Sequence, residues 1–193
     1  MLRITAANSC KREWPPNLCL GGVENEVLRM IRQPKDPEDE TVIEQRAVQL
    51  LSRREQSEYE LVQKLCQRGF AKEAVQRVVA KLQERRWQSD QRFAEMFYRS
   101  RVEQGHGPIK IKAEMQQRGI AAATIDEIFS SAETDWVALA TDRYLRKFGA
   151  AKLSQLEPKE RAKRQRFLAQ RGFSANHVYA AEAAAQESLE NAD

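Results

Sequence analysis

The chain has 193 residues, of which 41% are hydrophobic and 31% are charged, and its formal net charge is +4. It lacks the run of about 18 apolar residues that a membrane-spanning helix needs. Polar residues break up the N-terminal region, so no secretory signal is predicted either; they are Asn8, Lys11, Arg12 and Glu13. We therefore expect a cytoplasmic protein.

Cysteine and histidine are too sparse to predict disulfides or metal sites. The three cysteines form no CxxC pair, which is typical of reduced thiols in the cytosol; they are Cys10, Cys19 and Cys66. The two histidines, His106 and His177, are far apart in the sequence. No metal and no other cofactor is predicted.

The net charge is distributed unevenly along the chain. Residues 1–44 hold six basic and eight acidic side chains, and residues 182–193 hold four acidic side chains and no basic ones. The section between them therefore carries a net charge of +10. A basic body between acidic ends favours a polyanionic partner or an acidic protein surface.

Residues 1–40 are predicted to form a disordered or weakly ordered tail. Turn-forming residues interrupt this region; they are Pro15, Pro16, Gly21, Gly22, Pro34 and Pro37. An acidic run ends it; it consists of Asp36, Glu38, Asp39 and Glu40. One short helix is expected around Val27, Leu28 and Ile31.

After the tail, apolar residues at helical spacing predict nine helices in three groups and no strand. The first group has helices near 41–53, 58–68 and 71–85, the second of them opened by the capping box Ser57-x-x-Glu60. The second group begins at Ser89-Asp90, continues from Pro108 and ends near 121–132. The third begins at Thr134, stops at Gly149, restarts at Pro158 and has its last helix from Ser174.

One string occurs in every group, Gln-Arg-Gly followed by a hydrophobic residue. Its glycines, Gly69, Gly119 and Gly172, stand 50 and 53 residues apart. A period of this size indicates one supersecondary unit used repeatedly. A glycine can adopt the left-handed conformation that ends a helix, so each string predicts a sharp corner between two helices.

The predicted fold is therefore all-α, an elongated array of three tandem three-helix repeats with helix-turn-helix-like corners. The repeats are expected over 41–88, 89–133 and 134–188, followed by an acidic C-terminal tail at 189–193. In the last repeat, Glu182 stands where the earlier repeats have Val79 and Phe129. A polar residue there predicts a terminal repeat whose outer face meets water.

The corners also resemble those of DNA-reading helix-turn-helix units, which leaves a sequence-specific DNA-binding regulator as an alternative. Those units usually have a small residue four positions before the glycine, so that the two helices approach closely. Here that position holds Leu65, Met115 and Leu168. We interpret the pattern as a shared way of packing two helices, with base reading less favoured.

Catalytic patterns are weak. The string Gly105-x-Gly107 before a helix is similar to a phosphate cradle, but Lys110 occupies the place of a third glycine. We interpret it as a turn, with anion binding at the next helix start as the minor alternative. His106 is expected to be solvated and His177 to pack, so no Ser-His-Asp or Cys-His set is formed. We predict that the protein is not an enzyme.

Two clusters of basic residues are the candidate partner-binding or DNA-binding residues, selected on charge alone. One surrounds the Gly105–Gly107 turn and the other follows Pro158. Lysines and arginines in these clusters are also compatible with solvated helix faces. The ten candidates are Arg99, Arg101, Lys110, Lys112, Arg118, Lys159, Arg161, Lys163, Arg164 and Arg166.

Several strings resemble the RecX family of bacterial recombination regulators. The first runs Trp87-x-x-Asp90-x-Arg92-Phe93-Ala94 and continues as Arg99-x-Arg101. The second is Gly105-x-Gly107-Pro108-x-x-Ile111-x-x-Glu114-Met115-x-x-Arg118-Gly119-Ile120, and the third is Arg166-Phe167-Leu168-x-x-Arg171-Gly172-Phe173. The resemblance covers roughly residues 41–182, with Lys110 where an arginine is expected.

This resemblance implies a monomeric helical modulator of the RecA recombinase, active in DNA repair by homologous recombination and in the SOS response. Such a protein binds in the groove of the RecA–single-stranded DNA filament, blocks its extension and inhibits ATP hydrolysis and strand exchange. It contacts single-stranded DNA weakly or only within the filament. A generic helical-repeat adaptor is a third hypothesis.

Overall fold

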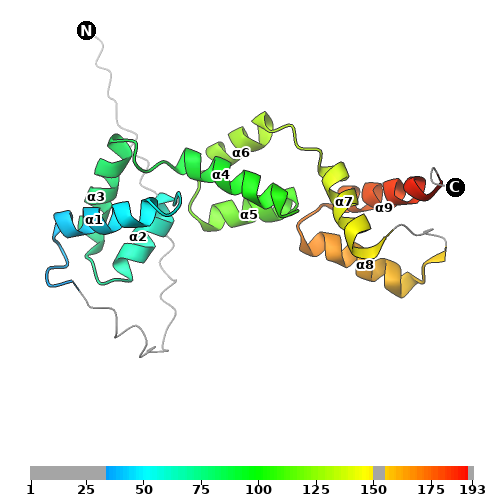
Figure 1. Cartoon of the computed structure of the whole chain (residues 1–193), viewed down its shortest axis with the longest axis horizontal. Coiled ribbons are helices and arrows are strands. Elements are labelled where there is room, and N and C mark those ends of the chain that lie inside the picture. The colour runs from blue at the N-terminus through cyan, green and yellow to red at the C-terminus, as the bar shows by residue number, and fades with distance from the viewer. Residues whose placement is uncertain (1–33, 150–154, 191–193) are drawn as a thin grey trace, which may run out of the picture. The chain divides into compact units, whose positions relative to one another are not determined.

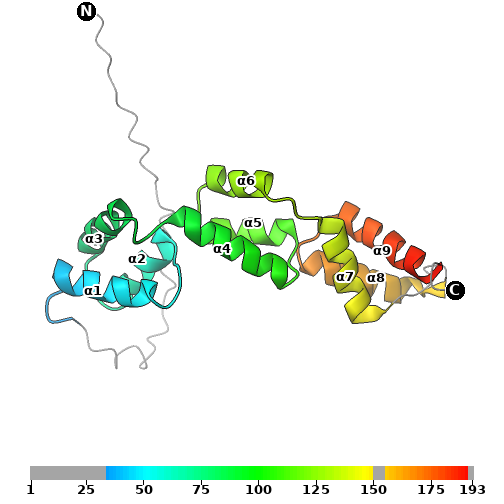
Figure 2. The ribbon, with the colours of Figure 1, turned by 45° about the horizontal axis from the view of Figure 1, so that its top comes forward.

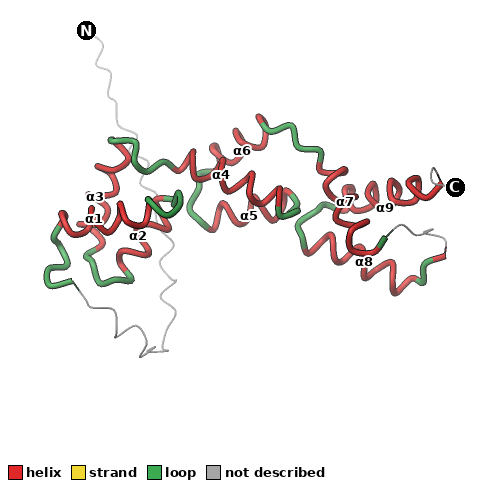
Figure 3. The backbone as a smooth tube through the Cα atoms, in the orientation of Figure 1, coloured by secondary structure: helices red, strands yellow, loops and turns green. Residues whose placement is uncertain are grey.

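The computed structural model describes residues 34–149 and 155–190, and this part of the chain is entirely helical and coil (Figures 1 and 3). It contains nine helices: α1 (Glu40–Leu51), α2 (Glu58–Cys66), α3 (Lys72–Glu84), α4 (Asp90–Glu103), α5 (Pro108–Gln117), α6 (Ala122–Ser131), α7 (Trp136–Phe148), α8 (Pro158–Gln170) and α9 (Ala175–Glu190). The all-α fold with three-helix repeats is confirmed. That the repeats form an elongated array stays a prediction.

Two expected features lie outside the described residues. They are residues 1–33 of the predicted tail, with its short helix around residues 27–31, and residues 191–193 of the acidic C-terminal tail. The two residues before these last three, 189 and 190, are still part of α9. Within the described ranges, no helix is long and apolar enough to cross a membrane.

The helices lie in three consecutive groups of three (Figure 2), and each group encloses a hydrophobic core of its own. Helices α1 to α3 surround Ile43, Leu61 and Leu82; α4 to α6 surround Phe93 and Ile125; α7 to α9 surround Tyr144 and Val178. Leu65, Met115 and Leu168 each have no exposed area. The space that a small residue would leave open at these corners is therefore filled by a large side chain.

The three corners have the same backbone geometry. Gly69, Gly119 and Gly172 have φ angles of 90°, 77° and 89°, a region that side chains with a Cβ rarely adopt. After each glycine, the next amide donates back to the carbonyl five residues earlier, at 3.4, 3.2 and 3.2 Å. This is the bond that closes a helix with a left-handed glycine.

The first repeat begins before residue 41, because part of the expected tail belongs to it. The carboxylate of Asp39 accepts hydrogen bonds from the Thr41 and Val42 amides and caps α1. The Pro37 carbonyl accepts from the Ala71 amide at 2.9 Å. Glu40 forms ion pairs with Arg77 and Lys81 on α3, at 2.7 and 2.6 Å. The sequence pattern did not predict these contacts, because the acidic run resembles the end of a disordered tail.

The expectation that Glu182 faces water is wrong. Its side chain is 1% exposed, because α8 covers it. One carboxylate oxygen accepts hydrogen bonds from Arg161 at 3.1 Å and from Gln165 at 3.0 Å. Val79, at the equivalent position of the first repeat, lies instead in a core of apolar side chains.

Candidate partner-binding surface

The first junction between repeats joins the start of α2 to the second repeat. The Glu58 amide, at the beginning of α2, donates to the Asp90 carboxylate at 2.8 Å. Arg118 from the corner of the second repeat pairs with Glu60 at 3.3 Å. A Cβ added to Gly119 would lie 2.7 Å from Tyr59 Cβ, so the corner approaches α2 too closely for a larger residue.

The second junction uses the same elements one repeat further on. The Gly107 and Ile109 amides, at the start of α5, donate to the Arg171 and Gly172 carbonyls at 2.8 and 3.1 Å. Arg143 on α7 donates to the Glu103 carbonyl at 2.7 Å. The amides that could have bound an anion at this helix start are therefore occupied by the third repeat, which removes the minor alternative for this glycine turn.

Residues of the strings quoted above for their resemblance to the RecX family form these junctions. Arg92 donates to the Arg86 and Trp87 carbonyls at 3.0 and 3.1 Å and pairs with Glu55 at 2.9 Å. Together with Asp90 and the glycines of the turns, it fixes one repeat against the next. The strings that resemble the RecX family thus contain the residues that join the repeats, and most of these residues stabilise the fold.

Two of the candidate arginines, Arg101 and Arg118, pack on one aromatic ring. Their guanidinium carbons lie 4.7 and 4.5 Å from the centre of the Phe97 ring. Arg101 also pairs with Glu114 at 2.7 Å. Because both charges are neutralised and partly buried, these arginines stabilise the second repeat and its junction.

The two candidate lysines on α5 are partly covered as well. Lys112 pairs with Asp126 at 3.3 Å, and its ammonium group lies 4.8 Å from the centre of the Phe129 ring. The backbone of Lys110 lies directly against Gly172, where a Cβ would clash with it. Neither residue belongs to an exposed cationic face.

Arg164 differs most from the sequence prediction, since it is 8% exposed and packs in the third repeat. Its guanidinium donates to the Tyr144 hydroxyl at 3.3 Å and pairs with Glu160 at 3.4 Å. It also lies 5.1 Å from the centre of the Phe148 ring. A contact with a partner therefore cannot use this side chain while the third repeat is folded.

The remaining candidates on α8 form one exposed face. Lys159, Lys163 and Arg166 are four and three residues apart, so they share a side of the helix, and all three are exposed. Lys163 has one ion pair, with Glu160 at 3.2 Å, and 69% of its side chain stays exposed. We name Lys159, Lys163 and Arg166 the α8 face. Arg161 lies beside it and pairs with Glu182.

Arg99, the last candidate, is also exposed, with 74% of its side chain accessible. It pairs with Glu95 at 3.6 Å and lines a shallow groove on α4. Three carboxylates line the same groove, those of Glu55, Glu95 and Glu103. They outnumber the two lining cations, Arg92 and Arg99, so Arg99 is a weaker anion contact than the α8 face.

His106 is partly buried rather than solvated. Burial lowers the pKa of its imidazole, and the nearby charges of Lys110, Arg101 and Arg171 lower this pKa further, against an opposing effect of Glu114. Two arginines outside the ten candidates also contact this turn: Arg171 donates to the Gln104 carbonyl at 3.5 Å, and Arg143 packs against Gly105. Arg171 stands in the repeated Gln-Arg-Gly string, which marked its corner but not its contact with this turn. For Arg143 the sequence held no signal, because it is far from the turn along the chain.

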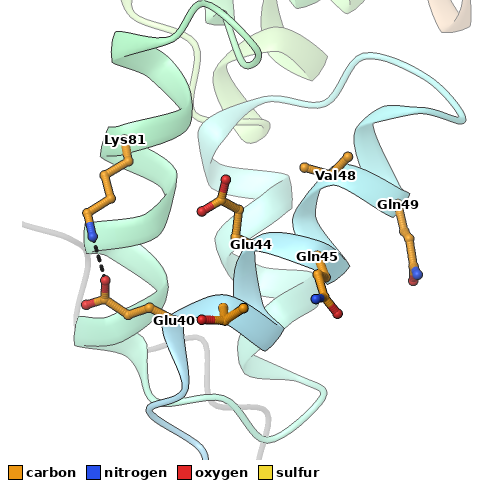
Figure 4. Close-up of a pocket in the computed structure, with 7 residues that line it drawn as sticks. Glu40, Glu44, Gln45, Val48, Gln49 and Lys81 are labelled. Atoms are coloured by element: carbon orange, nitrogen blue, oxygen red, sulfur yellow. Dashed lines mark hydrogen bonds and ion pairs between the residues drawn. The ribbon is translucent and has the colours of Figure 1, made fainter.

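A second groove, of about 650 Å³, lies between α1 and α3 (Figure 4). Glu40, Glu44 and Lys81 line it, and the figure shows Lys81 reaching Glu40. Lys81 and Arg77 hold the pKa of Glu40 below its usual range. Each lining carboxylate is thus paired with a cation, and in residues 34–149 and 155–190 no group of three potential ligands could hold a metal ion.

These features define a class of proteins with tandem three-helix domains joined through glycine corners. Family models for the first, second and third three-helix domains of RecX match residues 45–82, 89–128 and 133–181. The chain belongs to the RecX family of regulatory proteins.

Similar proteins agree with this assignment. The regulatory protein RecX of Halorhodospira halophila is 45% identical over 141 residues, which cover 73% of this chain and 86% of that protein. Its counterpart from Stenotrophomonas maltophilia strain K279a is 43% identical over 142 residues, 74% of this chain and 85% of that protein.

Two crystal structures have the same fold. A regulatory protein RecX aligns with a TM-score of 0.62 and 24% identity, over 72% of this chain and 70% of that one. RecX from Lactobacillus salivarius aligns with a TM-score of 0.61 and 17% identity, over 75% and 94%.

Proposed function

We propose that this protein regulates the RecA recombinase by binding in the groove of the RecA–single-stranded DNA filament. There it blocks filament extension and so reduces ATP hydrolysis and strand exchange. It acts by binding and not by chemistry, as a cytoplasmic protein that needs no cofactor. Membership of the RecX family is the observation that carries this proposal.

The α8 face supports a contact with a filament that contains DNA. Its three cations are exposed, and only Lys163 has an ion pair among the described residues. Such cations bind phosphate groups with a strong dependence on salt, because binding releases counterions. An array of similar repeats also suits a partner that is itself periodic.

Reading of a DNA sequence by one helix-turn-helix-like unit receives less support. In the second repeat, α6 would be the helix that enters a groove, and its exposed side carries Asp126 and Glu127. Two carboxylates there would be repelled by the phosphate backbone. The buried Met115 at the corner also favours repeat packing as the reason for this geometry.

A charge-reversal variant tests the proposal. The triple change Lys159→Glu, Lys163→Glu and Arg166→Glu should weaken binding to RecA–DNA filaments and reduce its salt dependence, with little change in stability, since exposed charges contribute within about 0.5 kcal/mol each. Arg99→Glu, in the groove lined by three carboxylates, is the control. Filament binding of the triple variant that equals wild type at physiological salt would place the contact elsewhere.

A further inference from the structure

Both junctions between repeats are built from the same two halves. One half is the corner arginine and glycine, Arg118-Gly119 at the first junction and Arg171-Gly172 at the second. The other half is the start of the middle helix in the preceding repeat, α2 or α5. Since each junction joins two different surfaces, the contact is heterologous and can in principle continue.

One corner and one helix start have no partner in the described part of the chain. The first repeat has a corner, Arg68-Gly69, and the described residues hold no repeat before it that this corner could contact. Gly69 is exposed there, whereas Gly172 at the second junction is buried. No hydrogen bond or ion pair of the Arg68 side chain is found in residues 34–149 and 155–190. Its neighbours Lys64 and Arg54 already pair with Glu60, at 3.8 and 3.0 Å. Burial and the charge of Arg54 lower the pKa of Lys64, against the opposing charge of Glu60.

The other unused half is the start of α8 in the third repeat. No side chain caps this helix, since Glu157 at its N-cap makes no such hydrogen bond. The corresponding amide of α5, that of Ile109, donates across the second junction to the Gly172 carbonyl, and at the first junction the Glu58 amide of α2 donates to the Asp90 carboxylate. In the described part of the chain, the Lys159 amide at the start of α8 has no such acceptor. Glu160 is the third residue of its helix, as Glu60 is of α2.

We propose that two copies of this chain associate head to tail through these unused halves, the corner of one copy docking on the start of α8 in the next. Arg68 then pairs with Glu160 of the other copy as Arg118 pairs with Glu60. The Lys159 amide donates to the Gly69 carbonyl as the Ile109 amide donates to Gly172. The occupant is a second copy because each described chain carries one unused corner and one unused helix start, the two halves from which its own junctions are built.

The contact is weak between free chains. Within one chain, a short connection gives the two halves an effective concentration in the millimolar range, and separate chains lack this advantage. Single chains are therefore the main species at micromolar concentration. If the proposed function holds, copies aligned on one filament gain the same advantage, and their binding becomes cooperative.

Sedimentation equilibrium of the purified chain, from micromolar to about millimolar concentration, tests the contact. The average mass of the wild type should rise with concentration, whereas the variant Arg68→Glu should stay monomeric. Arg46→Glu changes an exposed charge on α1 whose side chain hydrogen-bonds to Gln49 of the same helix; it is the matched control and should behave as wild type. The assay contains neither RecA nor DNA, so its outcome is independent of the proposed function.

A mixing experiment identifies the two surfaces. Glu160→Arg alone should also prevent association, and an equal mixture of Arg68→Glu with Glu160→Arg should restore it, because each copy then meets an opposite charge. Glu160 also pairs with Arg164, so thermal unfolding must first show that this variant folds. If it does not, the Arg68→Glu arm decides alone. A wild-type mass that stays constant, or an Arg68→Glu variant that associates like wild type, overturns the proposal.

Discussion

Replacing Arg164 should destabilise the third repeat, in contrast to its neighbours on α8. The side chain is 8% exposed and is held by the Tyr144 hydroxyl, the Glu160 carboxylate and the Phe148 ring. Arg164→Ala removes the contact of the cation with the rings, the packing of the arginine stem and the hydrogen bond that Tyr144 accepts.

The expected loss follows from these contacts. The ring contact contributes about 0.5–1 kcal/mol and the hydrogen bond with a charged donor about 1.5 kcal/mol. The ion pair with Glu160 adds little, because that carboxylate is 36% exposed. We therefore expect the free energy of unfolding to fall by about 2–3 kcal/mol.

Urea denaturation followed by circular dichroism measures this difference, and amide hydrogen exchange shows whether the loss is confined to α7, α8 and α9. Arg166→Ala, two residues away on the exposed face, is the control and should change stability by less than about 0.5 kcal/mol. Equal stabilities of the two variants would refute the assignment of Arg164 to the core and return it to the α8 face.

Three further changes test the junctions and the start of the fold. Gly107→Ala should weaken the second junction, because the added Cβ would clash with the Gly172 backbone; hydrogen exchange that stays unchanged at the α5 start would contradict this. Because folding lowers the pKa of His106, the unfolded chain takes up the imidazole proton at a higher pH than the folded protein does. The free energy of unfolding should therefore keep its full value above the usual histidine pKa of about 6.5 and decrease as the pH falls below it. In His106→Gln, the urea midpoint should lose this part of its pH dependence. Deleting residues 1–40 should lower the melting temperature relative to deleting residues 1–33, since only the longer deletion removes the Asp39 cap and the Glu40 ion pairs; equal melting temperatures would show that these contacts contribute nothing.

The repeats could be predicted from sequence because their determinants are local. The left-handed glycines at the corners and the apolar residues four positions before them act within one or two helical turns. Capping residues such as Ser57 and Ser89 act over three residues, and both accept the expected amide hydrogen bond, at 3.1 and 3.3 Å. Helix starts and stops followed from such signals.

The candidate surface was less predictable, because charge in a sequence does not show which cations find partners after folding. Arg164 and Arg166 are nearly adjacent and chemically identical, yet one is buried against Tyr144 and the other is exposed. The partners of Arg118 and Arg161 are 58 and 21 residues away. Such pairing depends on how helices pack, and helical spacing alone cannot give it.

The proposed role as a regulator of RecA filaments is tested most directly by following filament growth on single-stranded DNA in the presence of this protein. The account predicts that growth stops when the protein is well below one molecule per RecA subunit, since blocking extension requires few molecules. It also predicts that the triple glutamate variant of the α8 face loses this effect. Inhibition that begins only when the protein saturates the DNA would contradict the account and indicate simple competition for DNA.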